Sequence, residues 1–212
     1  MNGSLDVVRG RRIDRIEGAF ITHWMGGFER AIVDLGTGDG RWVYRQARRH
    51  PRRAFVGIDA NARLMREVSF RAGRKPARGG IGNLLFIRAE VHDLPQALNG
   101  VADEIYVLYP WGRLLETVWT PRPEGLRAVV RLARPAGRLE VHVNASAVAN
   151  RWTDTATLVA GYAAAGIRLQ SVRLEADAWR TSWAGRIAHG RDPRVVVLKG
   201  TAVLDHVGPV MV

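Results

Sequence analysis

Short apolar runs alternate with segments of helical spacing through the first half of this chain. Residues 31–35 have the pattern of a buried strand, a glycine-rich turn follows, and residues 41–47 continue with helical spacing. The same order repeats at once, with a second short strand at residues 54–59 and a helix over residues 61–72. Because strands that alternate with helices are joined by crossover connections, we predict a parallel sheet.

The rest of the chain extends this pattern. Further strands are expected at residues 84–87, 104–108, 138–143, 167–174 and 194–203, a helix over residues 121–134 and the end of another at residues 162–166. The last two strands lie close together in the sequence, which indicates an antiparallel edge. The basic, glycine-rich residues 73–80 are expected to form a surface loop. We predict an α/β fold with a mainly parallel seven-stranded sheet and helices on both faces, in one domain over residues 1–212 with an N-terminal extension of about 28 residues.

The turn after the first expected strand carries a binding motif. Residues 34–40 read DLGTGDG, and small residues between a strand and a helix let the backbone approach a ligand closely. Asp59 ends the next expected strand, where a carboxylate can accept hydrogen bonds from both hydroxyls of a ribose. The alternative is that the glycines only make a tight turn. The pairing with Asp59 favours a ligand that contains adenosine.

The spacing within this turn distinguishes between two such ligands. A dinucleotide site has the pattern G-x-G-x-x-G, which leaves room for a pyrophosphate at the helix N-terminus, whereas this turn has G-x-G-x-G. Asp34 and Asp39 would repel a pyrophosphate and suit a ligand that carries an amino group. S-adenosylmethionine (SAM) is therefore favoured over NAD as the cofactor.

The net charge of +12 predicts a polyanionic partner, since cations that neutralise phosphates release counterions on binding. Nucleic acid is the first candidate. The alternative is a solvated basic surface, because Lys75 and Lys199 are the only lysines and an excess of arginine is also typical of a GC-rich genome.

Several classes of protein are disfavoured by the composition. The chain has no cysteine, which removes thiolate nucleophiles and cysteine-based metal sites, and its six histidines are scattered, so no metal site is expected. No apolar stretch approaches the roughly 20 residues of a membrane span, and residues 1–12 lack the apolar core of a signal peptide. A cytoplasmic protein is expected.

Four blocks resemble the aminoglycoside-resistance methyltransferases of the Kam type, which modify N1 of adenine-1408 in 16S ribosomal RNA. They are residues 34–44 (DLGTGDGRWVY), 75–85 (KPARGGIGNLL), 110–115 (PWGRLL) and 182–191 (SWAGRIAHGR). The first block occurs in many methyltransferases, and the third and fourth are more specific. The resemblance implies a Rossmann-like class I methyltransferase fold and a 30S ribosomal subunit as the substrate. The protein is expected to act as a monomer.

The same resemblance implies roles for particular residues. SAM would be bound by Asp34, Gly36, Thr37, Gly38, Asp59, Ala60, Val91, His92 and Leu108. Trp111 and Trp183 would stack on the target base, which must leave its helix to be methylated. The other tryptophans are expected in the core: Trp24, Trp42, Trp119, Trp152 and Trp179. RNA contacts are implied for Arg71, Arg74, Lys75, Arg186, Arg191 and Arg194, and helical spacing would put the first three on one face.

Two stretches depart from the family pattern. Counting back from Pro95, His92 stands where the family carries a glutamate near the SAM adenine, so either His92 or Asp93 makes that contact or the contact is lost. The segment between Trp111 and Trp183 is also shorter than is typical of the family, chiefly around residues 145–155.

Adenine N1 has a lone pair and no proton at neutral pH, so no general base is expected and catalysis would consist of positioning.

Three alternative functions stay open. A tRNA guanine-N7 methyltransferase would share the first block but would not need both tryptophans. A homologue that binds SAM and ribosomal RNA without methylating it would explain the departures. A nicotinamide-dependent oxidoreductase is the least favoured.

Overall fold

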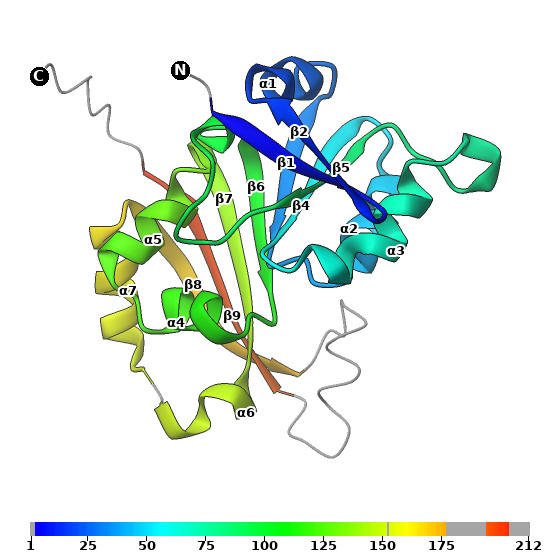
Figure 1. Cartoon of the computed structure of the whole chain (residues 1–212). Helices are drawn as coiled ribbons and strands as arrows, with labels where there is room; N and C mark the ends of the chain where they lie inside the picture. The colour runs from blue at the N-terminus through cyan, green and yellow to red at the C-terminus, as the bar shows by residue number, and fades with distance from the viewer. Residues whose placement is uncertain (1–2, 152, 177–193, 204–212) are drawn as a thin grey trace, which may run out of the picture.

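The computed structural model describes residues 3–151, 153–176 and 194–203 (Figure 1). Its strands are β1 (Ser4–Arg9), β2 (Arg12–Glu17), β3 (Arg30–Leu35), β4 (Arg53–Asp59), β5 (Leu84–Arg88), β6 (Ala102–Leu108), β7 (Ala133–Asn144), β8 (Ile167–Ala176) and β9 (Arg194–Ala202). Its helices are α1 (Ala19–Met25), α2 (Arg41–Arg49), α3 (Ala62–Ala72), α4 (Gly112–Trp119), α5 (Pro123–Val130), α6 (Ala145–Val148) and α7 (Thr155–Ala164). Short 3-10 turns lie at Pro76–Arg78, Gln96–Leu98 and Ala149–Arg151.

Within the described residues, nine strands form one sheet in the order β2-β1-β5-β4-β3-β6-β7-β9-β8. The five central strands, from β5 to β7, are parallel, while β9 and β8 close one edge in antiparallel pairing. The predicted α/β class, the mainly parallel core and the antiparallel C-terminal edge are confirmed. All the strands predicted from the apolar runs are present.

The sheet has two more strands than the seven predicted. They come from the segment expected to be an N-terminal extension, where β1 and β2 form an antiparallel hairpin that pairs with the outer edge of β5. A short hairpin at a sheet edge carries little apolar signal, since β2 has no buried residue. The hairpin covers a strand edge that would otherwise present unpaired backbone groups.

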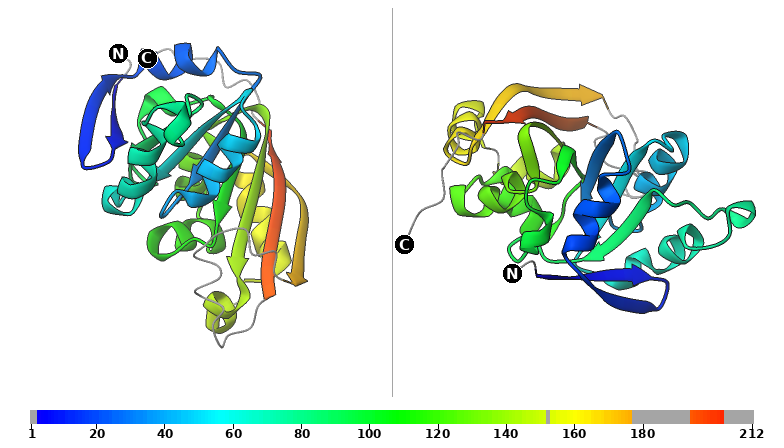
Figure 2. Two further views of the ribbon diagram at one scale, coloured as in Figure 1. Left: turned by 90° about the vertical axis from the view of Figure 1, so that its right-hand side faces the viewer. Right: turned by 90° about the horizontal axis from the view of Figure 1, so that it is seen from above.

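Helices cover both faces of the sheet, as predicted (Figure 2). On one face, α2 and α3 bury Trp42, Val43 and Met65 against the strands. On the other, α4, α5 and α7 bury a larger core around Trp119 and Tyr162. The predicted helix over residues 121–134 is shorter than expected, because Arg131 caps α5 and β7 follows directly. The sequence pattern did not predict α1, α4 or α6.

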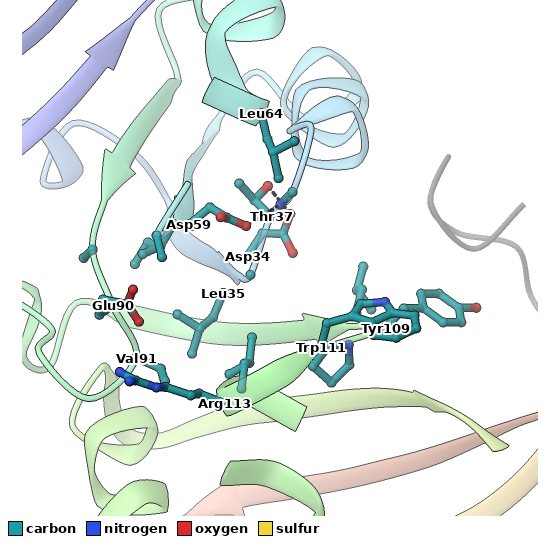
Figure 3. Close-up of a pocket in the computed structure, with 18 of the residues that line it drawn as sticks. Asp34, Leu35, Thr37, Asp59, Leu64, Glu90, Val91, Tyr109, Trp111 and Arg113 are labelled. Atoms are coloured by element: carbon teal, nitrogen blue, oxygen red, sulfur yellow. Dashed lines mark hydrogen bonds between the residues drawn. The ribbon is translucent and has the colours of Figure 1, made fainter. Parts of the chain in front are cut away.

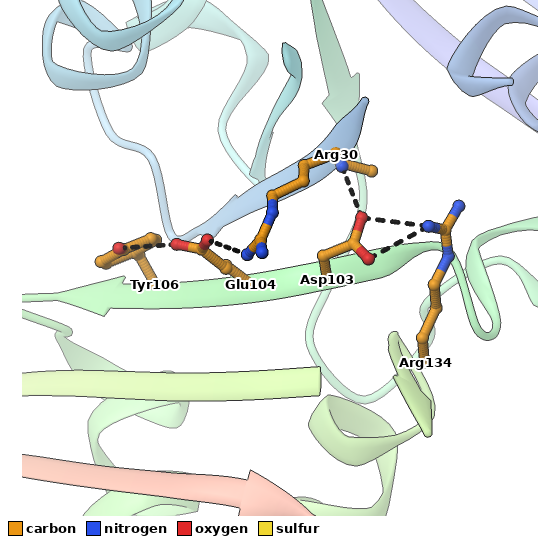
Figure 4. Close-up of polar contacts among 6 residues, drawn as sticks. Arg30, Asp103, Glu104, Tyr106 and Arg134 are labelled. Carbon is orange, nitrogen blue, oxygen red and sulfur yellow. Dashed lines mark hydrogen bonds and ion pairs between the residues drawn. The ribbon is translucent and has the colours of Figure 1, made fainter. Parts of the chain in front are cut away.

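A polar network fixes β6 between its neighbours at the amino ends of the strands (Figure 4). The Asp103 carboxylate accepts a 2.7 Å hydrogen bond from a backbone N–H of β3, and Arg134 of β7 donates to both its oxygens at 3.1 and 3.0 Å. Glu104 accepts hydrogen bonds from Arg30, at 3.2 Å, and from the Tyr106 hydroxyl, at 3.0 Å. These contacts hold the register of the strands whose opposite ends form the cleft described below.

Candidate active site

A cleft of about 490 Å³ lies at the carboxyl ends of the parallel strands, and the loops that follow β3, β4, β5 and β6 line it (Figure 3). This edge is where open α/β sheets bind their ligands, and the volume falls in the range of small-molecule sites. The lining residues are Asp34, Leu35, Gly36, Thr37, Gly38, Asp39, Trp42, Ile58, Asp59, Ala60, Leu64, Ala89, Glu90, Val91, Leu108, Tyr109, Pro110, Trp111, Arg113 and Leu114.

The turn between β3 and α2 forms the floor of the cleft. Its first two backbone N–H groups, of Gly36 and Thr37, donate to the Ile58 carbonyl of β4 at 2.8 and 2.9 Å, which fixes the turn against the next strand. Gly36 has a φ of +77°, and a Cβ there would lie 2.4 Å from the Leu114 side chain. A Cβ on Gly38, by contrast, would meet no atom within 4 Å, so the backbone at Gly38 borders open space. The turn therefore requires glycine and leaves room for a ligand.

Asp34 is the most deeply buried acid of the site. Its side chain is 2% exposed, and its Oδ2 accepts a 2.5 Å hydrogen bond from the Thr37 hydroxyl. Burial raises the pKa of Asp34 to about 7, although the Thr37 hydrogen bond opposes this and the nearby Asp59 and Asp39 add to it. A cationic ligand in the cleft would stabilise the ionised carboxylate.

Asp59 ends β4 on the opposite side of the turn. One of its oxygens accepts a 2.9 Å hydrogen bond from the Gly38 N–H, and the other accepts a 2.8 Å hydrogen bond from the Asn61 N–H. Burial raises the pKa of Asp59, these two bonds lower it, and the neighbouring Glu90 raises it. Each oxygen can accept a second hydrogen bond, so the carboxylate is oriented to take two hydroxyl groups from a ligand.

The other wall is the loop between β6 and α4. Tyr109 has a left-handed φ of 53°, and its backbone N–H donates to the His142 carbonyl of β7 at 2.8 Å. This turn leads through Pro110 to Trp111, which precedes the first residue of α4 as its N-cap and is 49% exposed. An aromatic ring this exposed, at the rim of the cleft, is available to a second ligand. Trp111 thus follows the end of β6 and lines the cleft, and its role toward a second ligand stays a prediction.

Most of the predicted cofactor residues meet in this cleft, and His92 does not line it. The His92 Nε2 lies 3.1 Å from the Thr117 hydroxyl of α4. Glu90 lines the cleft near Val91 instead, and its carboxylate is labelled in Figure 3. Counting back from Pro95 gives the sequence position that corresponds to the family's glutamate. It does not predict which side chains of an irregular loop point into the cleft.

The cleft also includes residues that the sequence analysis missed. They include Leu64, Glu90, Tyr109, Arg113 and Leu114. Arg113 and Leu114 lie inside the PWGRLL block, next to the predicted Trp111, so their place in that block was the available signal. Glu90 follows β5 just as Asp59 ends β4, and an acid after a third parallel strand could have been identified by the same argument.

The structure corrects the argument for the three predicted RNA contacts near α3. The helix ends at Ala72, so Arg74 and Lys75 lie beyond it and do not share a helix face with Arg71. All three side chains are nevertheless exposed, and Arg71 lies over the Tyr44 ring at 5.8 Å. Arg194 is exposed at the start of β9, whereas Trp183, Arg186 and Arg191 lie outside the described residues.

The prediction that the other tryptophans belong to the core is confirmed for Trp42 and Trp119, which are 6% and 1% exposed. Trp24 is partly buried and packs edge-on against Phe28. Trp152 and Trp179 lie outside the described residues.

Two negative findings apply to the described residues. In that part of the chain, no group of three or more histidine, aspartate or glutamate side chains is arranged to hold a metal ion. Likewise, none of the helices described above is both long and apolar enough to span a membrane.

Residues 6–202 match the model of the NpmA family, described as 16S rRNA (adenine(1408)-N(1))-methyltransferase. Curated enzymes of that name from Streptoalloteichus tenebrarius and Streptoalloteichus hindustanus are 34% and 35% identical to the chain. The alignments cover 92% and 87% of this chain and 97% and 93% of the relatives.

Solved structures give the same result. One of them is a tryptophan-to-alanine mutant of the 16S rRNA (adenine(1408)-N(1))-methyltransferase from Catenulisporales acidiphilia, solved with SAM. It superimposes on this chain with a TM-score of 0.87 at 33% sequence identity, and the match covers 97% of this chain and 100% of that one. The 16S rRNA methyltransferase KamB gives a TM-score of 0.85 at 32% identity, covering 93% and 99%. The chain therefore belongs to the NpmA family of 16S rRNA (adenine(1408)-N(1))-methyltransferases.

Proposed function

We propose that this protein transfers the methyl group of SAM to N1 of adenine-1408 of 16S rRNA in the assembled 30S subunit, and thereby confers aminoglycoside resistance. The observation that carries the proposal is the pairing, in one cleft, of an acidic cofactor floor with an exposed tryptophan at the rim. Membership of the NpmA family supports the choice of substrate.

The residues of the cleft fit SAM. Asp59 has two oriented oxygens for the ribose hydroxyls, and the open space beside Gly38 admits the ligand against the backbone. Asp34 and Asp39 suit the amino group of the methionine part, and Leu108 and Val91 supply apolar surface for the adenine ring. When bound, SAM supplies an electrophilic methyl group on its sulfonium.

The protein's part in the chemistry is to position the target. Adenine N1 has a lone pair and no proton at neutral pH, so the chain needs no general base. Trp111 offers its ring to an extruded adenine, and a stack of this kind contributes about 1–3 kcal/mol. Trp183 is the proposed second stacking residue.

The RNA backbone would be held by two groups of basic residues. These are Arg71 in the last turn of α3 with Arg74 and Lys75 just after it, and Arg186, Arg191 and Arg194 on the C-terminal side. A ribosomal substrate implies that the protein works in the cytoplasm. It would act as a monomer, since copies with a net charge of +12 repel one another.

The proposal is tested by transfer of labelled methyl from SAM to purified 30S subunits, with free 16S rRNA and bulk tRNA in parallel. Label in 30S subunits alone is the expected result. Label in tRNA would instead indicate a guanine-N7 methyltransferase. SAM and 30S binding without any label would indicate a homologue that docks on the subunit without methylating it.

A further inference from the structure

The tip of the N-terminal hairpin is unusually basic for so short a turn. Arg9 ends β1 and Arg12 begins β2, and Gly10 and Arg11 form the two-residue connection between them. Gly10 has a φ of +65°, which suits the first position of such a turn. Three guanidinium groups are thus carried on four consecutive residues.

The hairpin tip is fixed to the last turn of α3 (Figure 1). The Gly10 backbone N–H donates a 2.9 Å hydrogen bond to the hydroxyl of Ser69, which is only 4% exposed. The Phe70 ring packs on Gly10 so closely that a Cβ there would lie 3.2 Å from the Phe70 Cβ. The tip therefore lies against the last turn of α3, the turn that carries Arg71, and a buried contact sets its position there.

The acids at the tip do not balance its cations. The Asp14 carboxylate forms ion pairs with both Arg9, at 3.5 Å, and Arg12, at 3.0 Å, so one negative charge is shared between two guanidinium groups. Arg11 is exposed and makes no ion pair or hydrogen bond with the described part of the chain. The tip thus keeps a net positive charge next to other exposed cations, an arrangement that an anion would stabilise.

We infer that the hairpin tip is an additional contact for the RNA phosphate backbone, made chiefly by Arg11, which extends the basic surface after α3 away from the cleft. This inference rests on the proposed ribosomal substrate. A guanidinium group matches phosphate oxygens in a bidentate geometry, so phosphate is the ligand that an exposed, unpaired arginine recognises best. Because α3 spans about 16 Å, the tip would bind nucleotides well away from the target base.

The experiment measures binding of the full chain to 30S subunits between 50 and 200 mM salt, for wild type, Arg11→Gln and Arg11→Glu. Each phosphate contact contributes about 0.9 to the slope of log affinity against log salt. Arg11→Gln should therefore lower the slope by about 1, so that wild type loses about threefold more affinity than Arg11→Gln over this range. Arg11→Glu should bind more weakly than Arg11→Gln at every salt concentration.

Arg131 provides the matched control. It is exposed at the C-terminus of α5, on the other face of the sheet, and makes no side-chain ion pair with the described residues. Arg131→Gln removes the same charge and should keep the wild-type affinity and slope. Calorimetric binding of SAM verifies that all variants are folded.

The two proposals fail in different ways. If Arg11→Gln and Arg131→Gln have the same 30S affinity and slope while wild type methylates 30S subunits, the hairpin inference is wrong and the proposed function stands. If wild type neither binds nor methylates 30S subunits, the proposed function is wrong and the hairpin inference falls with it.

Discussion

The floor of the cleft and the outer end of α3 have opposite charge. Among the described residues that line the cleft, four are acids, Asp34, Asp39, Asp59 and Glu90, and Arg113 is a cation at the rim. Around the end of α3 the exposed side chains are mostly cations, a surface formed by Arg9, Arg11, Arg12, Arg71, Arg74 and Lys75. The cleft and this cationic surface lie at the two ends of one 11-residue helix.

This separation shows why a net charge of +12 says little about the catalytic cleft. The carboxylates of the cleft attract the amino and sulfonium groups of SAM and would repel phosphates. The guanidinium and ammonium groups of the cationic surface attract phosphates and would repel the cationic groups of SAM. Each class of ligand is therefore directed to its own region. The two regions also differ in how their side chains are held, because backbone hydrogen bonds orient Asp59, whereas Arg11 makes no hydrogen bond or ion pair with the described residues.

Replacing Asp34 with asparagine is expected to have the largest effect. The variant keeps the shape of the side chain and removes its charge, so SAM affinity measured by calorimetry should fall about 10- to 100-fold. Without ligand, however, the variant should be more thermally stable than wild type at pH 8, because it no longer buries an ionised carboxylate. Equal SAM affinity in the two proteins would contradict the assigned role of the acid.

Replacing Trp111 with alanine tests the other wall. Loss of one stacking surface should lower the rate of methyl transfer to 30S subunits on the order of 10- to 100-fold. SAM affinity should change little, and phenylalanine at this position should restore most of the rate. An unchanged rate in the alanine variant would contradict the stacking role of Trp111.

The pH dependence of SAM binding should follow Asp34. Its pKa is raised to about 7 in the folded protein, so below that pH the cationic ligand must displace a proton. SAM affinity should therefore fall as the pH is lowered from 8 to 6, by at most about tenfold per pH unit.

The raised pKa of Asp34 also affects stability. Its contribution to the free energy of unfolding of the ligand-free protein decreases as the pH rises from 3.8 to about 7. In the asparagine variant both dependences should be weaker, and what remains would come from other groups such as Asp59, whose pKa burial also raises.

Replacing Arg74 with glutamine should have the smallest effect. Loss of one phosphate contact should lower 30S affinity only a few-fold and reduce the salt slope by about 1, with no change in SAM affinity. Arg131→Gln again serves as the control. A large loss of SAM affinity would show that the cationic surface and the cleft are not independent.

Much of the fold and of the cofactor site could be predicted from the sequence because both depend on local patterns. Apolar runs and glycine turns gave the parallel strands, and Asp34 and Asp59 occupy fixed places at strand ends. The β1–β2 hairpin and the direction of His92 could not be predicted. Both depend on contacts between distant segments, Val7 pairing with Ile87 in one case and His92 meeting Thr117 in the other.

The most direct test of the central claim is to map the modified base by primer extension on 16S rRNA from 30S subunits treated with the protein and SAM. N1 lies on the Watson–Crick edge, so its methylation should stop reverse transcription next to adenine-1408. The account predicts that stop with wild type, a much weaker one with Trp111→Ala, and none without SAM. A stop at any other base, or full-length extension despite SAM and 30S binding, would contradict it.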